Sequence, residues 1–290
     1  MPASLRHLRH PGPTLQPRAE VVSGRARVFD LTLPAGLTLL EAITRECAAR
    51  GVDSAALSLG EGILDPLVYY LPAVVEGPFL RFGYSGEQRP GGAGRLEMGY
   101  ATFGLRDGAP FVHCHAVWLE EDGLCHGGHV LPSEAVLARP LAARALSLPG
   151  VALLSELDSE TDYQLFHPVR TSAEPAGASG GRAAYVRVRP NEDLTRAVER
   201  VCREEGYRSA TVRGLGSLIG ARFDDGREIE DQGSEIVVTR GHVAPGPDGR
   251  QRAEIDICFS GFSGLAARGR LLPDENPVCI TFELLIEEGP

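Results

Sequence analysis

Hydrophobic and polar residues alternate along several short stretches of this chain, and a period of two predicts β-strands. The clearest case is the stretch 111–131, where Phe111 to Leu119 is dominated by β-branched, aromatic and aliphatic residues. Turn-forming residues occupy Glu120 to Gly123, and Leu124 begins a second apolar stretch. We therefore expect a β-hairpin here.

A strand–turn–helix–strand pattern precedes this hairpin. Residues 24–33 alternate as a strand, and Thr38 with Glu41 three positions later has the spacing of a capping box. The helix is expected to run to about Arg50 and to end at Gly51, because glycine adopts the left-handed conformation that terminates helices. Residues 52–60 then form the next strand.

The same order of elements recurs in the second part of the chain, with a strand at 185–189, a helix at 194–205 and a strand at 211–216. An ungapped shift aligns six identical residues, in which Leu39, Ala42, Cys47, Gly51, Ser54 and Ala55 meet Leu194, Ala197, Cys202, Gly206, Ser209 and Ala210. These identities indicate a tandem duplication.

A second match, at a shorter shift, aligns residues 128–132 with residues 269–273. Counting back from it sets three histidines of the first copy against charged residues of the second: His113, His115 and His129 against Glu254, Asp256 and Arg270. Two carboxylates and a guanidinium can neutralise one another, so we expect a degenerate site without zinc-type chemistry. Plain surface charge on a strand is the alternative.

These patterns divide the chain into four segments. Residues 1–20 lack apolar periodicity and are expected to form a mobile tail. The first domain covers 21–170 and the second 183–288, and the Pro- and Gly-rich segment 171–182 is the linker between them.

Composition restricts the classes of function. The chain has 290 residues, is 43% hydrophobic and has no apolar run of membrane-spanning length or leading signal segment, so we expect a cytoplasmic protein that does not enter a membrane. Its six cysteines include no Cys-x-x-Cys pair and predict no disulfide framework. The net charge of −10 argues against broad binding to nucleic-acid phosphates.

His113 and His115 are the main candidates for metal binding. Strand side chains two positions apart share a face, with Cβ atoms roughly 6–7 Å apart, and two imidazoles at that distance can share one ion. With His129 they would form a three-histidine site with an open fourth position, which suits Zn²⁺ or a similar divalent metal.

The alternative is that these histidines are structural residues of a half-buried strand. If the hairpin pairs regularly about residues 121–122, His129 lies opposite Cys114, on the wrong face. The metal site then needs a bulge at Gly127 and Gly128 or a ligand from elsewhere. Cys125 is the one cysteine that we consider as an extra ligand.

The combination of the Leu-x-x-Ala helix, the Gly-x-x-Ser-Ala strand, His-x-His and Gly-Gly-His resembles the plants-and-prokaryotes-conserved (PPC) domain family. The segment from Asp158 to Tyr163 is similar to the closing segment of that domain, and residues 233–238 are similar to its central strand. The resemblance covers about 21–170 in full and about 183–288 in outline.

The resemblance implies an α/β (α+β) fold, with two tandem PPC-like domains that each pack one helix on a curved, mostly antiparallel sheet. It also implies assembly as a homotrimer, convergence of His113, His115 and His129 around a metal, and a DNA-binding role. The Arg-Gly-Arg-Pro core with which plant members grip DNA does not occur in this sequence.

Three functions remain open at this point. The first is a metal-binding protein that binds or acts on a small molecule, with Glu97 or Glu134 as a proton acceptor. The second is a DNA-associated module, whose local support is the basic tail residues Arg6, Arg9 and Arg18. The third is a structural oligomer without metal. The sequence contains no nucleotide-binding glycine motif and no serine-hydrolase motif, and it leaves the catalytic residues, if any, and the ligand unknown.

Overall fold

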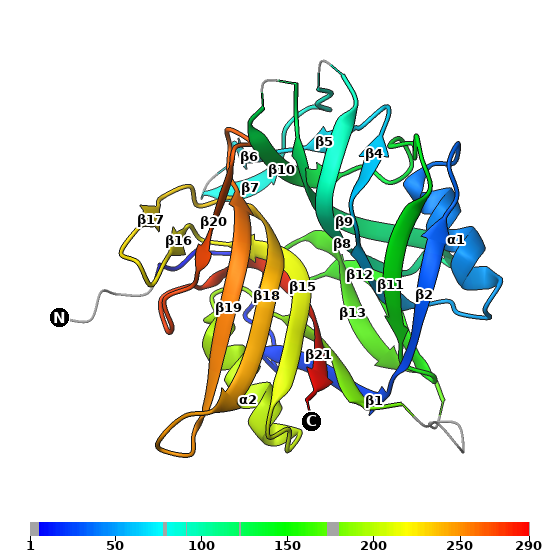
Figure 1. Cartoon of the computed structure of the whole chain (residues 1–290). Coiled ribbons are helices and arrows are strands. Elements are labelled where there is room, and N and C mark those ends of the chain that lie inside the picture. Colours follow the sequence, from blue (N-terminus) through cyan, green and yellow to red (C-terminus); the bar gives the residue numbers. More distant parts are fainter. Residues whose placement is uncertain (1–5, 78–79, 91, 122, 173–179, 290) are drawn as a thin grey trace.

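The computed structural model describes residues 6–77, 80–90, 92–121, 123–172 and 180–289 (Figure 1). Its elements in the first half of the chain are β1 (Ala19–Arg25), β2 (Arg27–Leu33), α1 (Leu39–Ala48), β3 (Ala55–Leu59), β4 (Gly62–Leu64), β5 (Tyr69–Tyr70), β6 (Pro72–Val75), β7 (Arg81–Tyr84), β8 (Gly94–Arg106), β9 (Ala109–Leu119), β10 (Cys125–Val130), β11 (Leu141–Ser147), β12 (Val151–Asp158) and β13 (Tyr163–Arg170). Those in the second half are β14 (Arg182–Val188), α2 (Leu194–Glu204), β15 (Ala210–Leu218), β16 (Ala221–Arg222), β17 (Glu228–Ile229), β18 (Glu235–Pro245), β19 (Gln251–Ser260), β20 (Ala266–Arg270) and β21 (Val278–Glu288).

The two halves have the same strand order. The amino-terminal half (residues 27–170) contains a sheet ordered β2-β11-β3-β8-β9-β10-β5. The carboxyl-terminal half (residues 182–288) contains β14-β21-β15-β18-β19-β20, with β1 added at the edge beside β14. The strands β2, β11, β3, β8, β9 and β10 thus correspond to β14, β21, β15, β18, β19 and β20, in the same order across the sheet. This agrees with the repeated pattern of elements along the chain.

The two helices of the described chain start and stop for local reasons. Thr38 caps α1 and forms the expected capping box with Glu41, and Gly51 has a φ of 64° just beyond the helix. Asp193 caps α2, and its side chain accepts a hydrogen bond from the backbone of Arg196. Each helix packs on the outer face of the sheet in its own half, with α1 at the right and α2 at the bottom of Figure 1.

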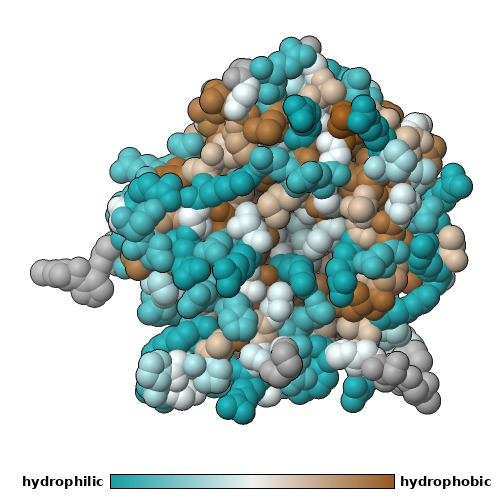
Figure 2. All heavy atoms as spheres, in the orientation of Figure 1, coloured by the Kyte–Doolittle hydropathy of each residue, from teal (hydrophilic) through white to brown (hydrophobic). Residues whose placement is uncertain are grey.

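The inner faces of the two sheets pack against each other. A central core joins residues of both halves, among them Tyr100, Val117 and Leu153 from the first and Tyr185, Val237 and Cys258 from the second. Hydrophilic residues gather over the lower part of the face shown in Figure 2, and hydrophobic patches lie among them over its upper part. No helix among the described residues has the length and apolar character needed to cross a membrane.

The prediction of a mobile tail over residues 1–20 is wrong for the part that the structure describes. Leu8 is 6% exposed and exchanges two backbone-to-side-chain hydrogen bonds with Asn191. Gly12 donates a backbone hydrogen bond to Glu160, and Arg18 forms an ion pair with the same residue at 2.7 Å. Residues 6–18 are therefore held against the body of the protein. The sequence did not predict this packing, because the segment has no apolar periodicity.

The strand expected over residues 24–33 is divided between the two sheets. Ala26 is buried in the central core, β1 before it pairs with β14 and β2 after it pairs with β11. The first domain therefore does not begin at residue 21, because residues 19–25 belong to the carboxyl-terminal sheet. The predicted linker at 171–182 ends at the first residue of β14, and most of it lies outside the described residues.

Candidate metal centre

The β9–β10 hairpin sets the register that brings the histidines together. His129 pairs with His115, and Val130 pairs with Cys114. The turn from Glu120 to Leu124 is closed by a hydrogen bond of 3.2 Å from the backbone N–H of Glu120 to the carbonyl of Leu124. This turn is longer than the two-residue turn at 121–122 considered above, so the register shifts by one residue and His129 moves to the face that His115 occupies.

The bulge considered at Gly127 and Gly128 is not formed, because pairing is regular from Cys125 to Val130. The two glycines allow close approach instead. A Cβ on Gly128 would lie 2.9 Å from the carbonyl oxygen of Tyr70 in β5, and one on Gly127 would lie 3.2 Å from the Cβ of Ser260 in β19.

The alternation of β9 directs the histidines between the two halves. His113 and His115 lie on the same face as Val117, which packs in the central core. Cys114 lies on the opposite face, in the core beneath α1, where burial raises the pKa of its thiol to about 12. One ligand atom each of His113, His115 and His129 lies within 4.8 Å of the other two.

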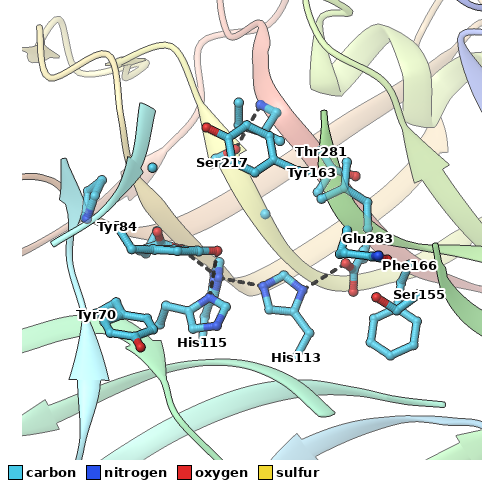
Figure 3. Close-up of a pocket in the computed structure, with 18 of the residues that line it drawn as sticks. Tyr70, Tyr84, His113, His115, Ser155, Tyr163, Phe166, Ser217, Thr281 and Glu283 are labelled. Atoms are coloured by element: carbon cyan, nitrogen blue, oxygen red, sulfur yellow. Dashed lines mark hydrogen bonds and ion pairs between the residues drawn. The ribbon is translucent and has the colours of Figure 1, made fainter. Parts of the chain in front are cut away.

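Hydrogen bonds fix how His113 and His115 are protonated. His115 Nδ1 lies 3.0 Å from the carbonyl oxygen of Ile236, which can only accept, so this nitrogen carries a hydrogen. His113 Nδ1 donates to Glu283 Oε1 at 2.8 Å. Their Nε2 atoms then face each other at 3.0 Å, and Glu235 Oε2 lies 2.7 Å from that of His115. Figure 3 shows the two rings pointing at one another, with Glu283 on the far side of His113.

Three acceptor atoms thus meet at one place when both rings are neutral. Their lone pairs repel unless a cation, either a proton or a metal ion, lies among them. Burial opposes a charge on His115, but the Glu235 carboxylate and the Ile236 carbonyl outweigh it and raise the pKa of His115. The site therefore attracts positive charge.

His129 is held in its neutral form. Burial, the His113 and His115 rings and the guanidinium of Arg106 keep the pKa of His129 well below its ordinary value. Its Nδ1 lies 3.1 Å from the hydroxyl of Tyr84. A neutral imidazole is the metal-binding form, and nitrogens on one tetrahedral zinc lie roughly 3.3 Å apart, so the trio fits a divalent ion after a small inward movement.

Glu235 and Glu283 are the site residues that the sequence alone does not reveal. They are 7% and 6% exposed and come from β18 and β21 of the carboxyl-terminal half. Each glutamate is more than a hundred residues away in sequence from the histidine that it contacts, so no local spacing in the sequence predicts the contact. The only hint in the sequence is that Glu235 lies in the stretch 233–238, which resembles the family's central strand.

The acids and the cysteine considered earlier lie elsewhere. Glu97 pairs with Arg268, and Cys125 donates a hydrogen bond of 3.5 Å to Glu97. Glu134 is exposed. None of these three residues lines the cavity that contains the histidines.

The counterpart residues of the second half form an ion cluster. Arg270 pairs with Asp256 across β19 and β20, at the position where His129 pairs with His115. Its guanidinium lies 2.8 Å from Asp256 Oδ1 and 3.1 Å from Glu254 Oε2. The Asp256 hydrogen bond and charge, with the Glu254 charge, raise the pKa of Arg270. The cluster is partly exposed. The carboxyl-terminal half therefore retains the strand pairing of the histidine site but has charged residues in place of the imidazoles.

The histidines open into a cavity of about 370 Å³ between the two halves. Its walls come from both halves, and the β12–β13 hairpin of the amino-terminal half contributes Ser155, Tyr163 and Phe166. Figure 3 shows Tyr163 and Ser217 across the cavity from His113 and His115. Besides the histidines, the residues that line the cavity include Arg106, Phe111, Ser155, Phe166, Thr281 and Glu283.

Residues 176–290 match the family model of the Plants and Prokaryotes Conserved (PCC) domain. The match thus covers the half whose counterpart site lacks histidines, while the histidine-bearing half has the same strand order. No curated protein has a sequence that matches this chain.

Several solved structures are similar to about half of the chain. A metal-containing protein from Archaeoglobus fulgidus, AF0104, is 20% identical with a TM-score of 0.40, and the match covers 51% of this chain and 96% of that one. A PPC protein from Pyrococcus horikoshii is 22% identical with a TM-score of 0.37, covering 51% and 95%. A hypothetical protein from Salmonella cholerae-suis is 16% identical with a TM-score of 0.37, covering 51% and 97%.

Proposed function

We propose that this protein binds one divalent metal ion at His113, His115 and His129 and uses it to bind a small molecule in the adjoining cavity. The observation that carries the proposal is the meeting of His113 Nε2, His115 Nε2 and Glu235 Oε2 within 3.0 Å of the central nitrogen. A divalent cation relieves the repulsion among these acceptors, and three imidazoles with an open position are typical of zinc sites that bind water or a ligand.

The chain's own residues would prepare this centre. Glu283 and the carbonyl of Ile236 hold the Nδ1 hydrogens of His113 and His115, which leaves the Nε2 lone pairs free to bind the ion. A zinc ion with an open position supplies a Lewis acid that polarises a bound oxygen. Glu235 Oε2 lies 2.7 Å from His115 Nε2, so its carboxylate would serve as a proton acceptor for a molecule bound at this centre.

Elemental analysis of untagged protein tests the proposal. Wild type is expected to retain about one equivalent of divalent metal per chain, and the double variant His113→Ala/His115→Ala is expected to lose at least nine-tenths of it. The matched control is His167→Ala/His242→Ala, because neither of these histidines lines the cavity. The proposal would be refuted if wild type binds no metal after incubation with Zn²⁺, or if His113→Ala/His115→Ala retains all of its metal. Either result would favour a structural role for the histidines.

Association with duplex DNA is the second candidate. A net charge of −10 weighs against it, because binding to phosphates needs a positive surface that displaces counterions. Retention on duplex DNA that falls steeply as salt rises would support DNA association, whereas lack of retention at low ionic strength would exclude it.

A further inference from the structure

Arg106 lines the cavity, where neighbouring side chains fix the position of its guanidinium but no carboxylate forms an ion pair with it among the described residues. Its guanidinium carbon lies 3.5 Å from the centre of the Phe111 ring, and its Nε donates to Ser155 Oγ at 3.0 Å. Ser155 is fixed in turn, because β12 pairs with the end of β8 in parallel and places Ser155 beside Arg106. One edge of the guanidinium is therefore anchored.

Arg106 also lines the cavity that contains the histidines. The two terminal amino groups of Arg106 have no hydrogen-bond or ion-pair partner among the residues that the structure describes. A guanidinium whose Nε is already engaged presents its two outer nitrogens as a fork, and this fork matches the two oxygens of a carboxylate.

Two further cavity atoms lack partners. Thr281 Oγ1 and Glu283 Oε2 are buried and make no hydrogen bond within the described chain. Buried polar atoms in native proteins are almost always satisfied, so these two indicate that a polar group of a ligand or a water molecule occupies the space before them.

The formal charges of the cavity favour an anion. Arg106 contributes +1, Glu235 and Glu283 contribute −2, and a divalent ion on three neutral imidazoles contributes +2, so the sum is +1. The walls of the cavity are mainly apolar, with Phe111 and Phe166 at 5.6 Å between ring centres on the Arg106 side. A monoanion with an apolar body satisfies both the charge and the walls, whereas a doubly charged phosphate group would leave charge unbalanced.

We infer that the cavity binds a small organic carboxylate with an apolar or aromatic body, with the carboxylate on the outer nitrogens of Arg106 and the body between the aromatic walls. This inference rests on the proposed metal centre for its charge balance. Arg106 would be a binding residue for the ligand and would take no part in holding the ion. A cavity of about 370 Å³ is large enough for a single aromatic ring with a short side chain.

The test uses Zn²⁺-loaded full-length protein and three probes, benzoate, phenylacetate and 3-phenylpropionate, each compared with its neutral primary amide. Titration calorimetry is expected to show that at least one carboxylate binds at least about tenfold more tightly than its amide. Arg106→Met keeps the aliphatic stem but removes the charge, and it should abolish that preference. Arg106→Lys should restore part of it, since the charge returns without the fork.

Arg144→Met is the matched control, because Arg144 lies on β11, is mostly exposed and does not line the cavity. Metal content is measured on every sample. Normal metal content in Arg106→Met with loss of the carboxylate preference supports the inference. It is overturned if no carboxylate binds the metal-loaded protein better than its amide, or if Arg106→Met keeps the preference. If wild type does not retain Zn²⁺, the proposed metal centre is refuted. That outcome is distinct from a failure of the carboxylate inference, which is judged on metal-loaded protein.

Discussion

At the scale of single residues, the site depends on where hydrogens lie. His113 and His115 are useful as ligands because Glu283 and the carbonyl of Ile236 each take the hydrogen of one ring nitrogen. The sequence supplies the imidazoles, but it does not say which of the two nitrogens of each ring is free. That choice is made by acceptors that fold back from the other half of the chain.

Replacement of Glu283 by glutamine tests this dependence. The amide can still accept from His113 Nδ1, but it loses the negative charge that strengthens the ligand. We expect Glu283→Gln to weaken Zn²⁺ binding by about 10- to 100-fold, as judged by competition with a chromophoric chelator.

The control for this variant is Glu288→Gln, at the partly exposed end of the same strand, where the glutamate pairs with Arg182 at 3.4 Å. Equal affinities of the two variants would show that the Glu283 charge does not support the metal.

At the scale of elements, the two helices occupy corresponding places with different caps. The cap Thr38 of α1 is accompanied by the capping box with Glu41. The cap Asp193 of α2 is 5% exposed and accepts three hydrogen bonds, from the backbone of Arg196, the hydroxyl of Thr195 and the backbone of Asn276. The second cap therefore ties its helix to the loop before β21.

Removing each cap is expected to have unequal effects on stability. Thr38→Ala should lower the free energy of unfolding by about 1 kcal/mol, the ordinary value of an N-cap. Asp193→Ala should lower it by about 3 kcal/mol, because it also leaves buried donors unpaired. Urea unfolding followed by circular dichroism measures both values, and equal losses would mean that the bonds to Thr195 and Asn276 add nothing.

At the scale of the whole molecule, a buried ion cluster joins the two halves. Asp158, at the end of β12, lies 2.7 Å from Arg187 of β14 and 2.7 Å from Arg189, which follows that strand. Glu20 of β1 pairs with the same two arginines at 3.3 and 2.6 Å. This cluster ties the β12–β13 hairpin to β1 and β14, which form the edge of the carboxyl-terminal sheet.

The cluster should make stability depend on pH. Burial alone would raise the pKa of Asp158, but the charge of Arg187 and the hydrogen bonds from both arginines and Thr161 outweigh it and lower that pKa well below its ordinary value. A carboxyl with a depressed folded-state pKa stabilises the protein above its unfolded pKa of about 3.9 and loses this effect as the pH falls below it.

We therefore expect the urea midpoint of wild type to fall between pH 5 and pH 3, and that of Asp158→Asn to fall less. At pH 7 this variant should lose about 3 kcal/mol, because two buried arginines lose a charged partner. Asp162→Asn, at an exposed carboxylate 3.6 Å from Arg81, is the control and should stay within about 0.5 kcal/mol of wild type. A pH dependence that Asp158→Asn leaves unchanged would contradict this role.

The homotrimer implied by the family resemblance stays a prediction at this scale, and so does the identity of the metal. Light scattering of the intact protein would give a mass of about three times 31.0 kDa if the trimer forms. A mass equal to that of one chain would show that the protein is a monomer, in which the two halves pack against each other without further subunits.

Local pattern determined the elements that depend on neighbours in sequence. The cap at Thr38, the common face of His113 and His115 and the repeated order of elements all follow from periodicities of 3.6 and 2 and from side chains within a few positions. The tertiary structure alone decided the sheet to which residues 19–25 belong, the turn that brings His129 beside His115, and the approach of Glu235 and Glu283 to the imidazoles. The reason is physical: these outcomes depend on packing between segments far apart in the chain, and the pattern within one segment does not encode which partner will cover it.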